Sequence, residues 1–336
     1  MGRREGAEVA TRLVLDCDTG DDDAVAIMLA ALHPELELVA VTTVNGNVEV
    51  NYCTANSLRV LDYIGRGKIP VYEGASSPLV RDDFPIPRAV LPSHTQNPNY
   101  SKHLDLPAAT STKKRGVAAE FLVQCFQESY ASKDEVVLVA TGPLTNLALA
   151  MKLDPSFASH VRRLVIMGGG HQEANETPSA EFNIWADPEA ARVVLASGID
   201  EVVLVPLDAT HRALVSSNDC ARLRSLGTAA ARATAMLVEQ RIRFYEGWQP
   251  MDRANSVPVH DALCVAYLVD PSVISIQKYW VDVETHGELT VGRTVIDTHG
   301  RSRREPNVWV ALDANESLFV RILTETFANH DESLAD

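Results

Sequence analysis

The chain has 336 residues, and 46% of them are hydrophobic, so it can bury the core of one large or two ordinary domains and is not typical of a disordered protein. Acidic residues outnumber basic ones by 45 to 30, which gives a formal charge of −15. A surface this acidic disfavours the nucleic-acid backbone and anionic membranes as partners and leaves small neutral or metal-complexed ligands.

The five cysteines are scattered and contain no CxxC pair. This usage is typical of buried thiols in a reducing compartment and not of a disulfide framework or a zinc site. The first 12 residues lack the apolar core of a secretory signal, and no apolar run approaches the ~20 residues that span a bilayer. We therefore expect a cytoplasmic protein.

Short apolar runs alternate with helical patterns over the first two thirds of the chain. Strands are expected at 13–15, 36–44, 69–72, 136–140, 164–167 and 201–206. Helices are expected at 22–32, in a second segment that ends at about 62, and at 117–130. Two more are expected after Thr141-Gly142-Pro143 and at 187–197, the latter with Pro188 in its first turn. The alternation predicts a doubly wound α/β fold, in which helices flank a mainly parallel central sheet.

The pattern changes after about residue 217. A long helical stretch is expected at 218–247, followed by a helix at 260–269. Residues 275–297 and 306–312 alternate like antiparallel strands or a hairpin, and a last helix covers 316–328. We expect one domain over 12–330, with flexible tails at 1–11 and 331–336. Residues 75–116 are the least regular part and are typical of a mobile active-site lid or a disordered segment.

The densest chemical signal follows the first strand, where five carboxylates lie within eight positions: Asp16, Asp18, Asp21, Asp22 and Asp23. Like charges this close repel, and a bound cation relieves the repulsion. All-oxygen ligands favour Ca²⁺ or Mg²⁺ over zinc. The alternative is a solvated acidic cap on the next helix, where the helix dipole favours negative charge.

Other predicted strands also end in polar or glycine-rich sequence. These segments are Asn45–Asn47, Thr141–Asn146, Gly168–Asn183 and Leu207–His211. Each could be ordinary turn chemistry. The carboxyl ends of parallel strands meet at one edge of the sheet, however, so the segments together predict one site built from many loops.

Over about 12–330 the chain resembles the inosine–uridine-preferring nucleoside hydrolase family. The first matching blocks are Asp16-Cys17-Asp18-Thr19-Gly20-Asp21-Asp22-Asp23-Ala24, Thr42-Thr43-Val44-Asn45-Gly46-Asn47 and Thr141–Asn146. The later ones are Met167–Gly170, Ala180–Ala191 and Val259-His260-Asp261. The order and spacing of these blocks make the resemblance specific.

The resemblance implies a Ca²⁺-dependent ribonucleoside hydrolase that cleaves a purine or pyrimidine nucleoside to ribose and free base. It implies that the metal ligands are Asp18, Asp23, the Thr141 carbonyl and Asp261. It further implies that the ribose is bound by Asp22, Asn47, Asn175, Glu181 and Asn183, and that Met167 lines the sugar pocket. Asp16 is assigned to structure. Similar proteins are homodimers or homotetramers, so a homo-oligomer is expected.

Cleavage of the N-glycosidic bond passes through a cationic sugar, which an anionic pocket stabilises. A metal and a carboxylate together lower the pKa of water, and Asp18 is the candidate general base. His260 is the candidate acid for the leaving base, and Trp248 is a candidate stacking surface for it. Either residue could instead be structural.

The chain departs from the family pattern at two places. Thr19 replaces the usual proline of the first motif, and Asp21 adds a further acid. The lid, at 82–116, lacks the glycines of the family's His-Gly-x-x-Gly segment and offers His94 and His103 as possible contacts to the base. These differences leave the base preference open.

Two other functions are compatible with parts of the sequence. An apolar strand followed by Asp16-Cys17-Asp18-Thr19 is similar to the start of haloacid-dehalogenase-like phosphohydrolases, in which the first Asp is a nucleophile assisted by Mg²⁺. The Thr lies one position early, and the extra acids would repel a phosphate. A non-catalytic nucleoside- or ribose-binding protein is the third hypothesis, although pure binding does not need a water-activating base.

Overall fold

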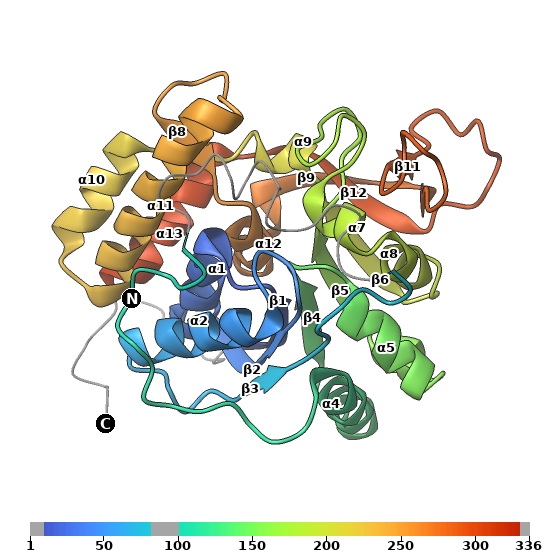
Figure 1. Ribbon diagram of the computed structural model, residues 1–336, viewed down its shortest axis with the longest axis horizontal. Helices are drawn as coiled ribbons and strands as arrows, with labels where there is room; N and C mark the ends of the chain where they lie inside the picture. Colours follow the sequence, from blue (N-terminus) through green and yellow to red (C-terminus); the bar gives the residue numbers. More distant parts are fainter. Residues whose placement is uncertain (1–9, 82–100, 330–336) are drawn as a thin grey trace, which may run out of the picture.

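An eight-stranded sheet forms the centre of the computed structural model, which describes residues 10–81 and 101–329 (Figure 1). Its strands are β1 (Thr11–Cys17), β2 (Leu36–Thr43), β3 (Val71–Glu73), β4 (Val136–Ala140), β5 (Arg163–Met167), β6 (Glu201–Val205), β9 (Ile274–Tyr279) and β12 (Val308–Ala314). The order is β3-β2-β1-β4-β5-β6-β12-β9, and β9 alone pairs antiparallel, at one edge. The predicted doubly wound α/β fold is confirmed.

Helices cover both faces of this sheet (Figure 1). One face carries α1 (Asp21–Leu32), α2 (Val50–Tyr63), α10 (Ser217–Leu226), α11 (Ala229–Trp248), α12 (His260–Val269) and α13 (Glu316–Ala328). The other carries α4 (Ala118–Ser132), α5 (Thr145–Leu153), α6 (Phe157–His160) and α8 (Pro188–Leu195). Shorter helical turns are α7 (Phe182–Ala186), α9 (Leu207–Thr210) and the 3₁₀ turn η2 (Pro271–Val273).

The strands are apolar throughout because both faces of the sheet are buried. Along β1, Leu13 and Leu15 pack in the core beneath α1 and α12, whereas Val14 packs in the core beneath α4 and α5. In β4, Val137 and Val139 face the first core and Leu138 faces the second. Continuous apolar runs of this kind are typical of buried parallel strands.

The order of the strands reverses beside β1. The chain passes from β1 to β2 and β3 on one side and then returns to β4 on the other side of β1. Open α/β folds bind ligands at the carboxyl ends of the strands where this reversal occurs. The loop after β1 contains Asp18, and the loop after β4 begins with Thr141.

Several predicted boundaries change. The single helical stretch at 218–247 is wrong, since Gly227, with a φ of 77°, ends α10 in a left-handed conformation that glycine adopts without strain. Thr228 then caps α11. The antiparallel region is confirmed, as β9 pairs with β12 while β10 (Val281–Val283) pairs with β11 (Thr294–Ile296). A further pair, β7 (Leu214–Ser216) with β8 (Ser256–Pro258), was not predicted.

The described part of the predicted lid, residues 101–116, lies against α2 without forming a helix or strand. The Asp62 carboxylate accepts hydrogen bonds from the backbone N–H groups of Thr110 (2.6 Å) and Ser111 (2.9 Å). Arg59 donates to the Leu106 carbonyl at 2.6 Å. The rest of the predicted lid, including His94, lies outside the described residues, as do most of the predicted tails.

All five cysteines are free thiols, and Cys125 is the only one of them that is not buried. None of the helices that the structure describes is long and apolar enough to cross a membrane.

Replacement of Asn146 by alanine tests how strongly the sheet depends on its buried polar bonds. The Asn146 amide donates to Asp16 Oδ1 (2.8 Å) and to the Thr43 carbonyl (2.9 Å), and it accepts from the Ala75 N–H (2.9 Å). Asn146→Ala leaves these buried partners unpaired and should lower the free energy of unfolding by about 2–4 kcal/mol in urea denaturation.

The matched control is Asn329→Ala, at an exposed helix end where the amide donates to the Glu325 carbonyl. This change should alter the free energy of unfolding by less than about 0.5 kcal/mol. Equal effects of the two substitutions would contradict the role given to Asn146.

Candidate functional site

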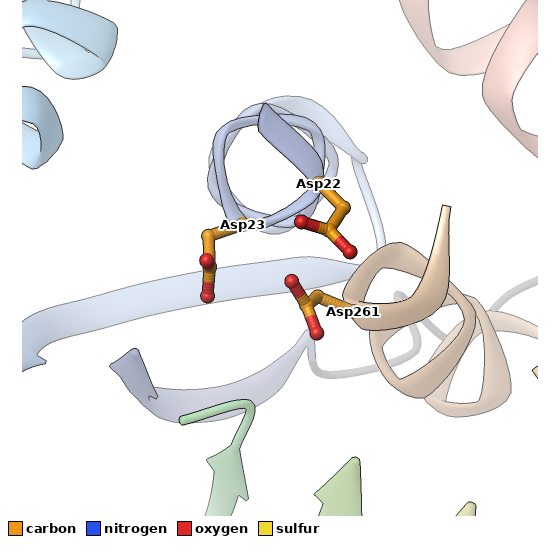
Figure 2. Close-up of side chains that lie close together, drawn as sticks. All are labelled: Asp22, Asp23 and Asp261. Carbon is orange, nitrogen blue, oxygen red and sulfur yellow. The ribbon is translucent and has the colours of Figure 1, made fainter. Parts of the chain in front are cut away.

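Three carboxylates from two helices meet at the carboxyl edge of the sheet. Asp22 and Asp23 lie in the first turn of α1, Asp261 lies in the first turn of α12, and their side chains point toward one another (Figure 2). One carboxylate oxygen from each lies within 4.8 Å of the others, and all three residues are buried. Helix N-termini favour negative charge, but two of them do not cancel three buried carboxylates.

The pKa values reflect this crowding. Burial and the charge of Asp22 raise the pKa of Asp23 to about 7. Burial and the charges of Asp22, Asp23 and Asp18 hold the pKa of Asp261 well above its usual range. The Arg241 guanidinium pairs with Asp22 and offsets part of the repulsion, and the charge that remains favours bound protons or a bound cation. Its ligands are all oxygens, so the donor set fits a hard ion such as Ca²⁺ or Mg²⁺.

Asp18 lies beside this cluster without being part of it. Its Oδ2 accepts the backbone N–H of Asn47 at 2.5 Å, and burial with the charge of Asp23 raises the pKa of Asp18 well above its usual range. A Cβ at Gly46 would lie 1.9 Å from Asp18 Oδ2, so only glycine leaves room for this carboxylate. The family resemblance implies Asp18 as a metal ligand and Asp22 as a sugar ligand, whereas the three-carboxylate cluster contains Asp22.

Neighbouring polar groups fix Asp23 and Thr141. Asp23 accepts hydrogen bonds from the Gly20 N–H (2.9 Å), the Thr141 hydroxyl (2.9 Å) and the Asn47 amide (3.3 Å). The Thr141 carbonyl accepts from the Asn183 amide at 2.9 Å. The loops after β1, β2 and β4 are thus joined to one another at the cluster.

A cavity of about 770 Å³ opens above these residues. Its size lies in the range of small-molecule sites and suits a nucleoside. Apart from Asp23, every residue predicted for the site lines it: Asp18, Asp22, Asn47, Thr141, Met167, Asn175, Glu181, Asn183, Trp248, His260 and Asp261. The predicted convergence of the strand ends therefore does place these side chains around one space.

Backbone contacts hold one wall of the cavity. Glu181 caps α7, and its carboxylate accepts the N–H groups of Gly169 and Asn183, both at 2.8 Å. Burial raises the pKa of Glu181 to about 7. Asn175 Oδ1 accepts the Phe182 N–H at 2.9 Å. These polar atoms are fixed in place before a ligand binds.

Another part of the cavity lining is aromatic. The His260 ring contacts the Tyr245 hydroxyl through Nε2 (3.0 Å) and the Thr210 hydroxyl through Nδ1 (2.7 Å). Burial and the charge of Arg241 hold the pKa of His260 well below its usual range, so the imidazole is neutral. Trp248 stacks on Phe244 with ring centroids 5.1 Å apart.

Of the two candidate lid histidines, His103 is described and also lines the cavity. Its ring makes an edge contact with Tyr52, with centroids 5.0 Å apart.

Arg241, Tyr245 and Glu176 also line the cavity, although they were not predicted as site residues from the sequence. Arg241 and Tyr245 share a face of α11 with Trp248 at spacings of four and three residues, and this helical periodicity was the available signal. Glu176 follows Asn175, and burial raises the pKa of its carboxyl to about 7. No local pattern marks it as a site residue.

Asp16 lies outside the lining of the cavity. Its Oδ1 accepts the Thr42 hydroxyl (2.5 Å) and the Asn146 amide (2.8 Å), and burial raises the pKa of Asp16 to about 7. A nucleophile must reach its substrate, so the phosphohydrolase hypothesis, which requires an accessible Asp16, is wrong.

Known proteins resemble the chain over almost its full length. The sequence model described as "Inosine-uridine preferring nucleoside hydrolase" matches residues 13–321. The pyrimidine-specific ribonucleoside hydrolase RihA of Enterobacter sp. (strain 638) is 37% identical over 322 residues, which cover 95% of this chain and 98% of the relative. RihA of Escherichia coli O7:K1 (strain IAI39 / ExPEC) is 36% identical and covers 94% and 98%.

Solved structures resemble it as well. A plant nucleoside hydrolase, the PpNRh1 enzyme, is 27% identical with a TM-score of 0.83 and covers 95% of this chain and 99% of its own. The purine-preferring ribonucleoside hydrolase from Gardnerella vaginalis is 28% identical with the same TM-score and covers 97% and 99%. All of these relatives are named as hydrolases, which supports an enzyme over a non-catalytic binding protein.

The raised pKa values predict how stability depends on pH without metal. The carboxyl pKa of Asp23, about 7, lies above the ~3.8 of an unfolded chain, so the native state binds more protons and loses stability as pH rises from about 4 to 7. In chelator, the melting temperature should fall between pH 5 and pH 8. Added Ca²⁺ should raise it more at pH 8, because the cation replaces the protons.

Asp261→Asn removes one of the crowded charges and should make the decline in chelator shallower. Thermal unfolding of both proteins at the two pH values, with chelator or with CaCl₂, measures the effect. A melting temperature that changes neither with pH nor with added Ca²⁺ would contradict a cation site at the cluster.

Proposed function

The chain belongs to the inosine-uridine preferring nucleoside hydrolase family, and we propose that it is a Ca²⁺-dependent ribonucleoside hydrolase that prefers pyrimidine nucleosides. The observation that carries the proposal is a buried carboxylate cluster whose Asp22 and Asp261 line a nucleoside-sized cavity. The pyrimidine preference rests on the relatives of 36–37% identity that are named pyrimidine-specific, against a purine-preferring one at 28%. By resemblance to the family, the protein would form a homodimer or homotetramer.

The metal ligands in this proposal are Asp18, Asp23, the Thr141 carbonyl and Asp261. Asp22 adjoins them in the cluster and adds negative charge. When bound, Ca²⁺ would neutralise these carboxylates and lower the pKa of a water molecule. The crowding of buried acids supports this assignment, because it is costly unless a cation is present.

The ribose would occupy the polar half of the cavity. We assign its hydrogen bonds to Asp22, Asn47, Asn175, Glu181 and Asn183, with Met167 against the sugar ring. The amide of Asn183 and the carboxylate of Glu181 are already held by backbone groups. A sugar that enters this half exchanges its hydration for prearranged partners, which favours ribose over sugars that lack a hydroxyl.

The chemistry then requires a base and a stabilised cation. Asp18 is the proposed general base, since its carboxylate lines the cavity and its orientation is fixed by the Asn47 N–H. The C1′–N bond breaks as the water oxygen bonds to C1′, and positive charge develops on the sugar. The surrounding carboxylates stabilise that charge in the transition state.

The leaving base would lie against the aromatic part of the lining. We propose that His260 is the acid for the leaving base. Because its imidazole is neutral in the free protein, it must first accept the proton released from the water, and it must exchange its contact with the Tyr245 hydroxyl for one with the base. Trp248 would extend the wall on which the base stacks. Water thus supplies a hydroxyl group to ribose and a net proton to the base.

A panel of purine and pyrimidine nucleosides tests the reaction. Ribose release should be fastest with uridine or cytidine and should fall to background after chelation, with recovery on addition of Ca²⁺. Turnover that is insensitive to chelator would contradict the metal dependence. Faster release from inosine or guanosine would contradict the pyrimidine preference.

Substitution of two neighbouring aspartates distinguishes a catalytic role from a structural one. Asp18→Asn removes the general base and should lower kcat by about 10²–10⁴-fold. Asp16→Asn retains the shape of a side chain outside the cavity and should leave kcat within about tenfold of the wild type. Steady-state rates with uridine, on proteins checked for folding by circular dichroism, measure both. A larger loss with Asp16→Asn would overturn the assignment.

A further inference from the structure

Arg241 is a largely buried guanidinium in the wall of the cavity, with 15% of its side chain exposed. It lies on α11 and forms an ion pair with Asp22, with Nη2–Oδ2 at 3.0 Å and Nη1–Oδ1 at 3.2 Å. A largely buried cation needs an anionic partner, because burying an unpaired charge is costly. The partner of Arg241 is a member of the carboxylate cluster.

Further contacts fix the orientation of the guanidinium. Nε donates to the Pro258 carbonyl at 3.0 Å, Nη2 donates to the Tyr245 hydroxyl at 3.1 Å, and the group lies 4.9 Å from the centroid of the Tyr245 ring. These contacts engage at most four of its five N–H groups. At least one N–H on Nη1 therefore has no partner among the described residues, and Arg241 lines the cavity where a ligand could accept it.

The contacts also place Arg241 between the two parts of the site. On one side it binds Asp22 of the carboxylate cluster. On the other it binds Tyr245, whose hydroxyl contacts His260. In the proposed function these parts hold the sugar and the base, so the guanidinium lies close to the bond that joins them.

We propose that Arg241 is a catalytic and specificity-determining residue that stabilises negative charge on the departing base. This inference rests on the proposed function. As the C1′–N bond breaks, its electron pair moves onto the base, and in a pyrimidine it delocalises onto the carbonyl oxygen beside the glycosidic nitrogen. A fixed guanidinium stabilises that oxygen, keeps its own proton throughout, and favours bases that carry a carbonyl at this position.

The alternative role is purely electrostatic support of Asp22. In that case Arg241 would act on the sugar and the cation site, and its loss would affect every riboside equally. A role at the leaving group would instead affect poor leaving groups most. The two roles therefore differ in their dependence on the leaving group.

The experiment compares uridine with 4-nitrophenyl β-D-ribofuranoside, whose phenolate leaves with little help, on Ca²⁺-loaded protein. Arg241→Met should lower kcat for uridine by ~100-fold or more and for the nitrophenyl riboside by less than ~10-fold. Arg241→Lys keeps the cation without the planar fork and should show a smaller loss with the same substrate dependence. Arg241→Lys also tests the inference if the Arg241→Met variant does not fold.

Arg232→Gln is the matched control, because Arg232 is an exposed arginine of the same helix that lies outside the described lining of the cavity. It should change both rates by less than ~3-fold, as expected for a solvent-screened charge. Equal losses on both substrates in the Arg241 variants, no loss on either, or the same selective loss in Arg232→Gln would each overturn the inference. Wild-type protein that cleaves neither riboside would overturn the proposed function and this inference with it, whereas the other outcomes require an active wild type.

Discussion

The electrostatic cost of burying several carboxylates together is the constraint on which the site depends. Asp22, Asp23 and Asp261 are buried within 4.8 Å of one another, with Asp18 beside them. The charge of Asp22 raises the pKa of Asp23, and the charges of Asp22, Asp23 and Asp18 raise the pKa of Asp261, while the nearby helix dipoles and Arg241 offset only part of the repulsion. Such a cluster persists where a cation is bound and where the developing positive charge of a reaction uses it.

Buried hydrogen bonds near the cluster hold the surrounding loops in position. Asn146 joins Asp16 of β1 to the Thr43 carbonyl of β2 and to the loop after β3. Gly46 leaves the space that the Asp18 carboxylate occupies. The loops at the strand reversal are thus fixed by the sheet itself, which is how a rigid fold can hold charges at positions that they would otherwise leave.

The cavity is lined by carboxylates in one part and by Arg241, Tyr245 and His260 in another. Breaking a glycosidic bond develops opposite charges on the sugar and the base, so each part can stabilise one of them. The sugar becomes cationic and is proposed to lie at the acidic part, whereas the base takes the electron pair and is proposed to lie near Arg241, Tyr245 and His260. Helices α11 and α12 supply the second part, and α12 also supplies Asp261 to the first. A small relative movement of these helices would therefore affect both halves of the reaction.

The sequence alone determined the fold class, the acid cluster after β1 and the loops that gather at one edge of the sheet. These features follow from local patterns, since apolar runs of about five residues, glycine-rich breaks and motif spacing are written along the chain. The tertiary structure decided which carboxylates approach one another, so that Asp22 lies in the cluster and Asp18 beside it. It also revealed Arg241, Tyr245 and Glu176, because a side chain on α11 or in a loop becomes part of a cavity only through packing against distant residues. Asp22 and Arg241 are 219 positions apart and come into contact through the fold. No local pattern in the sequence predicts that contact.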